Sequence, residues 1–264
     1  MKNLLLSAAI GDIAGSAYER IKNSTKRYEE VRLLHPDVHF TDDTVCTFAC
    51  AEALLGGLDM GATLYRRCVD HLFAGYGSKF MQWLRSRNPK PYGSLGNGSA
   101  MRCSAAGWLA KTEEECIKLA TDTAMPTHNH PEGIKGAVAT ALAVYHLKTG
   151  KDKEFVRREV LGKYYPEWAD RHYADFHDNF GFDATCPGTV PPAIICFLES
   201  SDFAGCLRLA IALGGDADTL AAIAAPMAYA FYREMPQQLI DKSLSMLPVW
   251  MTDLNAKFDC AVDL

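Results

Sequence analysis

The sequence has little of three features that would each assign it to a different class of protein. Alternation of apolar and polar residues, the pattern of half-buried strands, is almost absent, which argues against a β protein. After the N-terminus the longest apolar stretch runs from Leu220 to Tyr232 and contains Pro226, so it falls short of the about 20 residues that span a membrane. Basic residues number 27 against 32 acidic ones, and this net charge of −5 offers no footprint for duplex nucleic acid or an anionic membrane.

The nine cysteines also lack a pattern, because their number is odd and no CxxC pair occurs among them. They stand in apolar sequence, as small core residues do. We therefore predict reduced thiols in the core and a cytoplasmic protein.

What the sequence does contain is helical periodicity. With 264 residues, 48% of them hydrophobic, the chain is long enough for a single compact domain over residues 1–264, and we expect an all-α fold. Residues 3–10 faintly resemble a secretory leader, but Asp12 ends the apolar run and Lys2 is the only basic residue before it, so we expect a helix there. The predicted helices cover 3–20, 44–56, 62–75, 100–111, 113–123, 133–149, 191–199, 203–213, 218–232 and 237–254, with loops at 88–98 and 179–192.

Two glycines and two acids share the predicted N-terminal helix. Gly11 and Gly15 lie one turn apart, and Asp12 and Glu19 lie two turns apart. Seven residues turn a helix by about 700°, so both carboxylates lie on one face. This pattern fits either a glycine-lined helix contact with two solvated acids or a pair of acids that faces a site.

A second acidic pair stands where an apolar helix begins, in the segment Thr41-Asp42-Asp43-Thr44. Thr41 can cap the helix, and acids in a first turn interact favourably with the helix dipole, by about 0.3–1 kcal/mol. Adjacent carboxylates and hydroxyls are also the hard oxygen ligands that Mg²⁺ or Mn²⁺ prefers. Capping and metal binding explain this segment equally well.

The segment Gly214–Thr219 repeats the arrangement behind a double glycine. Residues two apart on a helix point about 200° away from each other, so Asp216 and Asp218 converge only if Asp216 still lies in the turn. The double glycine allows such a turn. An ordinary cap needs one acid, whereas this segment has two followed by the hydroxyl of Thr219.

The acidic segments make chemical sense together. If Asp42, Asp43, Asp216 and Asp218 met in space, their charges would repel unless two divalent cations balanced them. Thr41 and Thr219 would then add hydroxyl oxygens, and Glu19 would be a spare carboxylate for proton transfer.

A loop rich in glycine and serine, from Tyr92 to Arg102, runs into a predicted helix. Amides at a helix N-terminus suit a phosphate or diphosphate, although many ordinary loops contain glycine. We expect Arg102 to form a structural ion pair rather than to enter the site.

His128 and His130 precede another predicted helix. No third histidine or cysteine nearby completes a zinc site, so the two histidines either cap that helix or contribute an imidazole beside the diphosphate.

The ordered set of these segments resembles the ADP-ribosylglycohydrolases, which include the dinitrogenase reductase-activating glycohydrolases and the ADP-ribosyl-acceptor hydrolases. The resemblance covers about residues 4–232. It rests on Gly11–Glu19, Thr41–Thr44, the Gly-Asn-Gly-Ser-Ala-Met-Arg core of the 93–102 loop, Thr127-His128 and Gly215–Thr219.

The resemblance implies an orthogonal multi-helix fold with two Mg²⁺ ions, or Mn²⁺, in a cleft. The implied metal ligands are Thr41, Asp42, Asp43, Asp216, Asp218 and Thr219. The implied binding residues for ADP-ribose are Gly93, Ser94, Gly96, Asn97, Gly98, Ser99 and His128, and the implied catalytic residues are Glu19 and Asp43. The implied reaction is hydrolysis of the C1″ glycosidic bond of ADP-ribose on a modified side chain or a small conjugate.

The stretch Gly15–Glu19 is similar to the branch that removes O-linked, serine-bound ADP-ribose, so we expect serine to be preferred over arginine. Leu95 departs from that branch, where an aromatic residue is frequent, and Ala217 stands where threonine or serine is commoner. Two alternatives stay open: a non-catalytic ADP-ribose binder with the same fold, and a metal-dependent hydrolase of another phosphorylated substrate.

Overall fold

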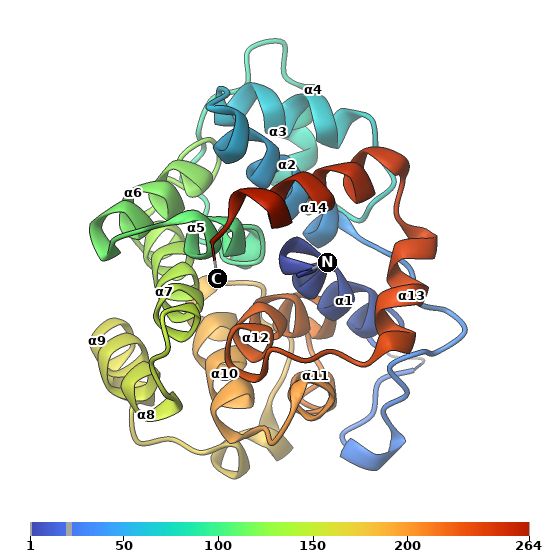
Figure 1. Cartoon of the computed structure of the whole chain (residues 1–264), viewed down its shortest axis with the longest axis vertical. Coiled ribbons are helices and arrows are strands. Elements are labelled where there is room, and N and C mark those ends of the chain that lie inside the picture. The colour runs from blue at the N-terminus through green and yellow to red at the C-terminus, as the bar shows by residue number, and fades with distance from the viewer. Residues whose placement is uncertain (1, 20–22, 264) are drawn as a thin grey trace.

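The computed structural model describes residues 2–19 and 23–263, and this part of the chain is helical and contains no strand, only one isolated bridge between Gly96 and Thr185. The all-α prediction is confirmed (Figure 1). The α-helices are α1 (Leu4–Ser16), α2 (Asp42–Gly56), α3 (Met60–Val69), α4 (Ser78–Arg85), α5 (Ser104–Leu109), α6 (Glu113–Ala124), α7 (Pro131–Lys148), α8 (Lys153–Phe155), α9 (Gly162–Tyr164), α10 (Cys186–Glu199), α11 (Phe203–Ala212), α12 (Ala217–Tyr232), α13 (Gln237–Met246) and α14 (Val249–Ala261). A π-helical turn, Val156–Leu161, joins α8 to α9.

Helices α1 and α12 lie side by side at the centre of the molecule (Figure 1). Every residue of α1 is buried, as expected for a helix that is apolar on all sides. The two helices approach closely because α1 carries glycines at the contact. A Cβ at Gly11 would lie 2.3 Å from the carbonyl oxygen of Ala221, and a Cβ at Gly15 would lie 2.5 Å from the Cα of Asp218.

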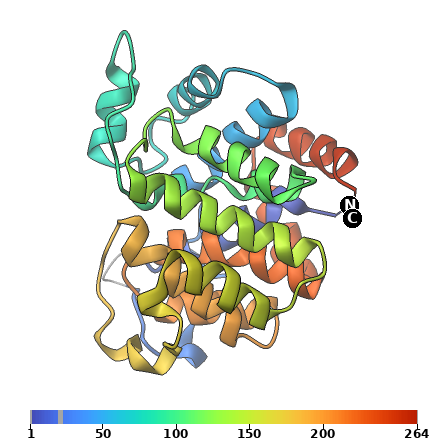
Figure 2. The same ribbon diagram turned by 90° about the vertical axis from the view of Figure 1, so that its left-hand side faces the viewer.

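The remaining helices cover this central pair. Helix α7 runs between α5 and α6 on one side and α10 and α12 on the other (Figure 2). The two ends of the chain lie together, because Asp259 of α14 accepts hydrogen bonds from the amides of Asn3 and Leu4 at 2.7 and 3.0 Å. A carboxylate at this position satisfies two N-terminal amides of α1 and complements its dipole.

Several predicted boundaries are wrong. The predicted helix 237–254 is two helices, since Leu247 is extended and Pro248 precedes the second one. The predicted helix 62–75 ends at Val69, and the predicted helix 100–111 is reduced to α5 after a 3₁₀ turn at Asn97–Ser99. The predicted helix 3–20 is described only to Ser16 as a helix, and Arg20 lies outside the described residues.

Three helical segments differ from the prediction: α10 begins inside a predicted loop, whereas α4 and the run from α8 to α9 (residues 153–164) have no predicted counterpart. Helix α10 begins at Cys186, inside the predicted loop 179–192, because Thr185 caps it and the interior prolines Pro191 and Pro192 do not end it. Helix α4 was missed although Phe80, Trp83 and Leu84 have helical spacing. The segment is only 8 residues long, which gives a weak periodic signal.

The prediction of core thiols holds for most cysteines. All nine are free, and eight are buried, whereas Cys260 in α14 is exposed. In the described part of the chain no helix is both long and apolar enough to cross a membrane.

The close contact between α1 and α12 generates a stability prediction. Gly11→Ala places a methyl group against the backbone of Ala221, so we expect the free energy of unfolding to fall by about 1–3 kcal/mol. Gly61→Ala is the matched control, since its nearest neighbour would be an Asp59 oxygen at 3.5 Å and alanine favours helix, with a gain of up to about 1 kcal/mol. Urea unfolding measures both, and equal stability of the two variants would contradict the prediction.

Candidate functional site

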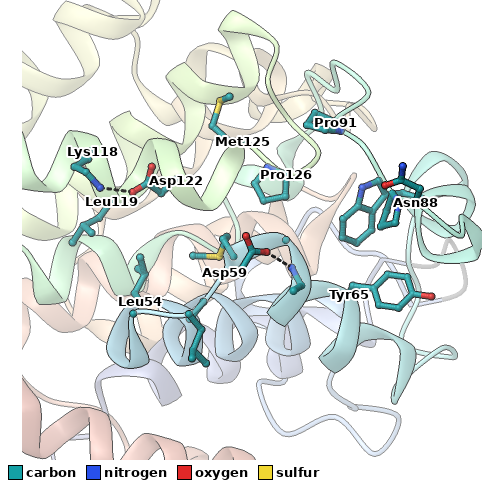
Figure 3. Close-up of a pocket in the computed structure, with 18 of the residues that line it drawn as sticks. Leu54, Asp59, Tyr65, Asn88, Pro91, Lys118, Leu119, Asp122, Met125 and Pro126 are labelled. Carbon is teal, nitrogen blue, oxygen red and sulfur yellow. Dashed lines mark hydrogen bonds and ion pairs between the residues drawn. The ribbon is translucent and has the colours of Figure 1, made fainter.

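Two cavities in the described part of the protein differ in chemistry. The larger, of about 980 Å³, lies beside the C-terminal end of α2 (Figure 3). Its two acids are already engaged: Asp59 accepts from the amide of Ala62 at 2.7 Å, and Asp122 pairs with Lys118 at 2.7 Å (Figure 3). Its walls are otherwise mostly apolar, so it holds no convergent catalytic groups.

The smaller cavity, of about 450 Å³, gathers most of the residues singled out from the sequence. It is lined by twelve of them: Glu19, Thr41, Asp42, Asp43, Ser94, Gly96, Asn97, Gly98, His128, Asp216, Asp218 and Thr219. Gly93 and Ser99 lie outside its wall. Residues that are far apart in the sequence thus meet where α1 ends and where α2 and α12 begin.

Asp12 belongs to this site, so of the two interpretations that the sequence left open for it, the solvated acid is wrong. Its side chain is fully buried. One oxygen accepts from the Thr41 hydroxyl at 2.7 Å, and the other accepts from the amides of Thr41 and Thr44 and from the Thr44 hydroxyl. The signal for this role was the position of Asp12 in a helix that is apolar on both sides, since a charge there needs partners.

The acids converge in two overlapping groups. Carboxylate oxygens of Asp12, Asp43 and Asp218 lie within 4.8 Å of one another, and those of Glu19, Asp216 and Asp218 do so as well. Three of the four aspartates expected to meet, namely Asp43, Asp216 and Asp218, belong to these groups, which Asp12 and Glu19 complete. Asp42 belongs to neither group but lines the same cavity.

The local backbone explains how Asp216 and Asp218 converge. Gly214 and Gly215 adopt positive φ angles of 71° and 67°, which form the expected turn before α12. Asp216 still belongs to this turn, whereas Asp218 lies in the first helical turn. Thr219 donates its hydroxyl to Asp43 at 3.3 Å and thereby connects α12 to α2.

The electrostatics of the cluster call for a counter-ion. Burial, and then the neighbouring carboxylates, raise the pKa of Asp42 to about 8 and hold the pKa of Asp43 and of Asp218 well above its usual range. Oδ2 of Asp43 is buried without a hydrogen-bond partner. An orphaned carboxylate oxygen among further carboxylates and hydroxyls fits a hard divalent cation, so these residues suit metal binding.

The glycine and serine loop is more structural than the sequence indicated. Several of its amides already donate within the protein, including those of Gly93, Ser94, Gly96 and Asn97. The side chain of Asn97 donates to Asp216 at 2.7 Å and to Thr189 at 3.0 Å. The hydroxyl of Ser99 donates to the carbonyl of Gly133 at 2.7 Å. These contacts attach the loop to the acidic cluster and to α7 and α10.

The two histidines have different roles. Nδ1 of His130 accepts from the amide of Glu132 at 3.1 Å and so caps α7. His128 instead lines the cavity, and burial lowers its pKa well below the usual value. Both expectations for Arg102 are wrong. In the described part of the chain this buried guanidinium contacts no carboxylate and donates to Thr123 and Thr127, and its residue is among those that line the cavity.

Comparison with known proteins agrees with this geometry. The family model described as ADP-ribosylglycohydrolase matches residues 1–258, and the chain therefore belongs to the ADP-ribosylglycohydrolase family. Membership of this family supports hydrolysis that removes ADP-ribose. The resemblance inferred from the sequence is thereby confirmed.

Individual relatives show similarity over most of the chain. ADP-ribosylhydrolase ARH3 of Homo sapiens is 26% identical over 310 residues, which cover 88% of this chain and 85% of that protein. ADP-ribosyl-[dinitrogen reductase] glycohydrolase of Rhodospirillum rubrum is 27% identical over 221 residues, and the match covers 73% of this chain and 68% of that protein. A solved structure described as an ADP-ribosylglycohydrolase-related protein complex shares the fold, with a TM-score of 0.71 at 23% identity. The match covers 97% of this chain and 94% of that chain.

The raised carboxyl pKa values generate a prediction about stability and pH. A carboxyl with a raised pKa binds its proton more tightly in the folded state than in the unfolded chain. The free energy of unfolding in EDTA should therefore fall as the pH rises from 3.8 towards about 8. Excess Mg²⁺ should oppose this loss, by about 2.7 kcal/mol when the free ion exceeds its Kd 100-fold.

Urea unfolding across this pH range, with EDTA or with Mg²⁺, measures the effect. Asp43→Asn should flatten the pH dependence in EDTA, whereas Asp122→Asn, in the surface pair with Lys118, should leave it unchanged. A stability in EDTA that rises over this range would contradict the prediction.

Proposed function

We propose that the protein is a magnesium-dependent hydrolase that removes ADP-ribose by cleaving its C1″ glycosidic bond. The substrate is a modified protein side chain, with serine preferred over arginine, or a small ADP-ribosyl conjugate. One observation carries the proposal: in a member of this family, the acids from the starts of α2 and α12 and the end of α1 meet in one cavity. The nine free thiols suit a reducing compartment, and we place the reaction in the cytoplasm.

Two Mg²⁺ ions, or Mn²⁺ in their place, would be held by oxygen ligands from both helix starts. We assign as ligands Thr41, Asp42, Asp43, Asp216, Asp218 and Thr219. When bound, the ions offset the negative charge of the cluster and orient the ribose hydroxyls. The orphaned Oδ2 of Asp43 supports this assignment.

The protein supplies the positioning of these ligands. Asp12 holds the start of α2 through Thr41 and Thr44. Asn97 holds Asp216 from the opposite wall, at 2.7 Å. Because both supports are buried, the ligand oxygens lose little freedom when the substrate binds, which lowers the entropic cost of alignment.

Glu19 is the residue to which we assign proton transfer. It is exposed at the cavity, beyond the end of α1, and its carboxylate lies within 4.8 Å of those of Asp216 and Asp218. Glycosidic cleavage passes through an oxocarbenium-like state, which needs a carboxyl group near the leaving oxygen or near the attacking water. We assign Glu19 to move this proton and Asp43, which is buried and shares Asp218 as a neighbour, as the second catalytic residue.

We assign substrate binding to His128 and to the loop residues Gly93, Ser94, Gly96, Asn97, Gly98 and Ser99, of which Gly93 and Ser99 lie outside the cavity wall. Ser94, Gly96 and Gly98 present small side chains or none to the cavity, which leaves room for a diphosphate. Leu95 is exposed at 37%, so its departure from the serine-specific branch affects the mouth of the site more than the acidic cluster. We therefore expect this position to tune the acceptor rather than the chemistry.

Release of ADP-ribose from serine-linked and arginine-linked peptides, each with Mg²⁺ or with excess EDTA, tests the proposal. We expect release from the serine-linked peptide only with Mg²⁺. Release in EDTA would overturn the metal dependence. Binding of ADP-ribose without release from either peptide or from a small conjugate would identify a non-catalytic binder instead.

Substitution of a metal ligand should abolish turnover because the cation site loses an oxygen. We expect Asp218→Ala to lower kcat by at least about 100-fold and to remove one Mg²⁺ from the binding isotherm. The matched control is Asp122→Ala on the surface, for which both measurements should equal the wild type. Unchanged binding of two Mg²⁺ by Asp218→Ala, measured by isothermal titration calorimetry, would refute the ligand assignment.

Substitution of Glu19 should separate proton transfer from metal binding. We expect Glu19→Gln to retain the stoichiometry of Mg²⁺ binding and to lower kcat by about 10²–10⁴-fold, the usual contribution of general acid–base catalysis. Glu167→Gln, an exposed glutamate away from the cavity, is the control and should match the wild type. A Glu19→Gln protein with wild-type kcat would assign proton transfer elsewhere.

A further inference from the structure

His128 is connected to a buried arginine through one hydroxyl group. Nη2 of Arg102 lies 2.8 Å from the hydroxyl oxygen of Thr127, and this oxygen lies 2.7 Å from Nδ1 of His128. All three side chains are buried. The cavity lining includes both Arg102 and His128, and Thr127 connects the two side chains.

The chemistry of the three groups sets the direction of these hydrogen bonds. A guanidinium donates and never accepts, so the Thr127 oxygen is the acceptor for Arg102. The hydroxyl hydrogen of Thr127 then needs an acceptor, and in the described part of the chain Nδ1 of His128 is the one within reach. Nδ1 therefore accepts, and the ring proton of a neutral imidazole stands on Nε2.

The hydrogen bonds of Arg102 to Thr123 fix its side chain in the orientation that the contact with Thr127 requires. Its Nε and Nη2 both donate to the carbonyl of Thr123, at 3.1 and 2.8 Å, and its side chain is fully buried. The positive charge beside the ring also disfavours an imidazolium. Burial and this charge together hold the pKa of His128 well below its usual range, which keeps the ring neutral.

Nε2 of His128 faces the glycines of the cavity wall. A Cβ at Gly98 would lie 3.1 Å from both Cε1 and Nε2, and one at Gly96 would lie 3.5 Å from Nε2. Among residues 2–19 and 23–263, no hydrogen bond to Nε2 is formed. A donor at the cavity wall without a protein acceptor is matched by a ligand atom that only accepts, such as a phosphate oxygen.

We propose that Arg102 and Thr127 are positioning residues that hold His128 as the Nε2–H tautomer and thereby present a neutral donor to an anionic, acceptor-only group of the ligand. Arg102 and Thr127 act through His128 and not on the reacting atoms. That the ligand group is the diphosphate of ADP-ribose rests on the proposed function. The tautomer itself does not.

Long-range proton–nitrogen NMR of the histidine rings, near neutral pH, tests the tautomer directly. In the wild-type protein we expect one protonated nitrogen, Nε2, and one unprotonated nitrogen, Nδ1, for the ring whose signals disappear in His128→Gln. A proton on Nδ1, or protons on both nitrogens, would overturn the proposal whether or not the protein hydrolyses ADP-ribose.

Thr127→Val removes the hydroxyl while it keeps the side-chain shape. We expect the tautomers of His128 to mix and the affinity for ADP-ribose, titrated with Mg²⁺ present, to fall by about 5- to 10-fold, as for the loss of one oriented hydrogen bond. Thr127→Ser should restore both readouts. A Thr127→Val protein that keeps a pure Nε2–H tautomer and wild-type affinity would overturn the proposal.

The matched control is Thr140→Val in α7. The hydroxyl of Thr140 is buried without a partner and takes no part in the hydrogen bonds that connect Arg102, Thr127 and His128. It should change neither the histidine spectrum nor the affinity. If ADP-ribose fails to bind the wild-type protein, the proposed function fails, while the histidine spectrum still decides the tautomer.

Discussion

The site depends on one buried carboxylate that belongs to the core. Asp12 sits in α1, surrounded by apolar helices, and accepts hydrogen bonds from the backbone and hydroxyls of Thr41 and Thr44. A buried charge is tolerated only with such partners, and hydrogen bonds to a charged group contribute about 1.5–3 kcal/mol each. The same contacts hold the first turn of α2 against α1, so Asp43 is directed at the acidic cluster as a consequence of folding.

The packing of α1 against α12 supplies the other half of the geometry. Gly15 approaches the backbone of Asp218 itself, so the absence of a side chain at this glycine decides how near Asp218 comes to Asp43. The contact between Gly15 and Asp218 thus packs α1 against α12 and at the same time places the carboxylate of Asp218. A helix start on each side directs its carboxylates to a common centre, where the repulsion among them is relieved either by protons or by cations.

The loop at 92–102 links the acidic centre to the opposite wall. Asn97 reaches Asp216, Ser99 reaches α7, and Arg102 reaches the segment before α7 through Thr127. Each of these polar side chains is buried and forms hydrogen bonds with another part of the site, although Nη1 of Arg102 has no partner. Rigidity of this kind keeps the cavity open to small, acceptor-rich groups and explains why glycines stand where a side chain would meet His128.

The sequence by itself determined the helical class, the family and the acids that meet, because periodicity and the order of short motifs are local properties. It left the roles of Asp12 and of the loop amides open and misjudged Arg102, since these roles depend on partners that are distant along the chain. The periodicity also predicted one helix in place of α13 and α14 and none at α4, because helix propensity is weak there and packing decides where the helices form. Only the tertiary structure settled which polar groups point inward, because burial and hydrogen-bond partners arise when separate helices meet.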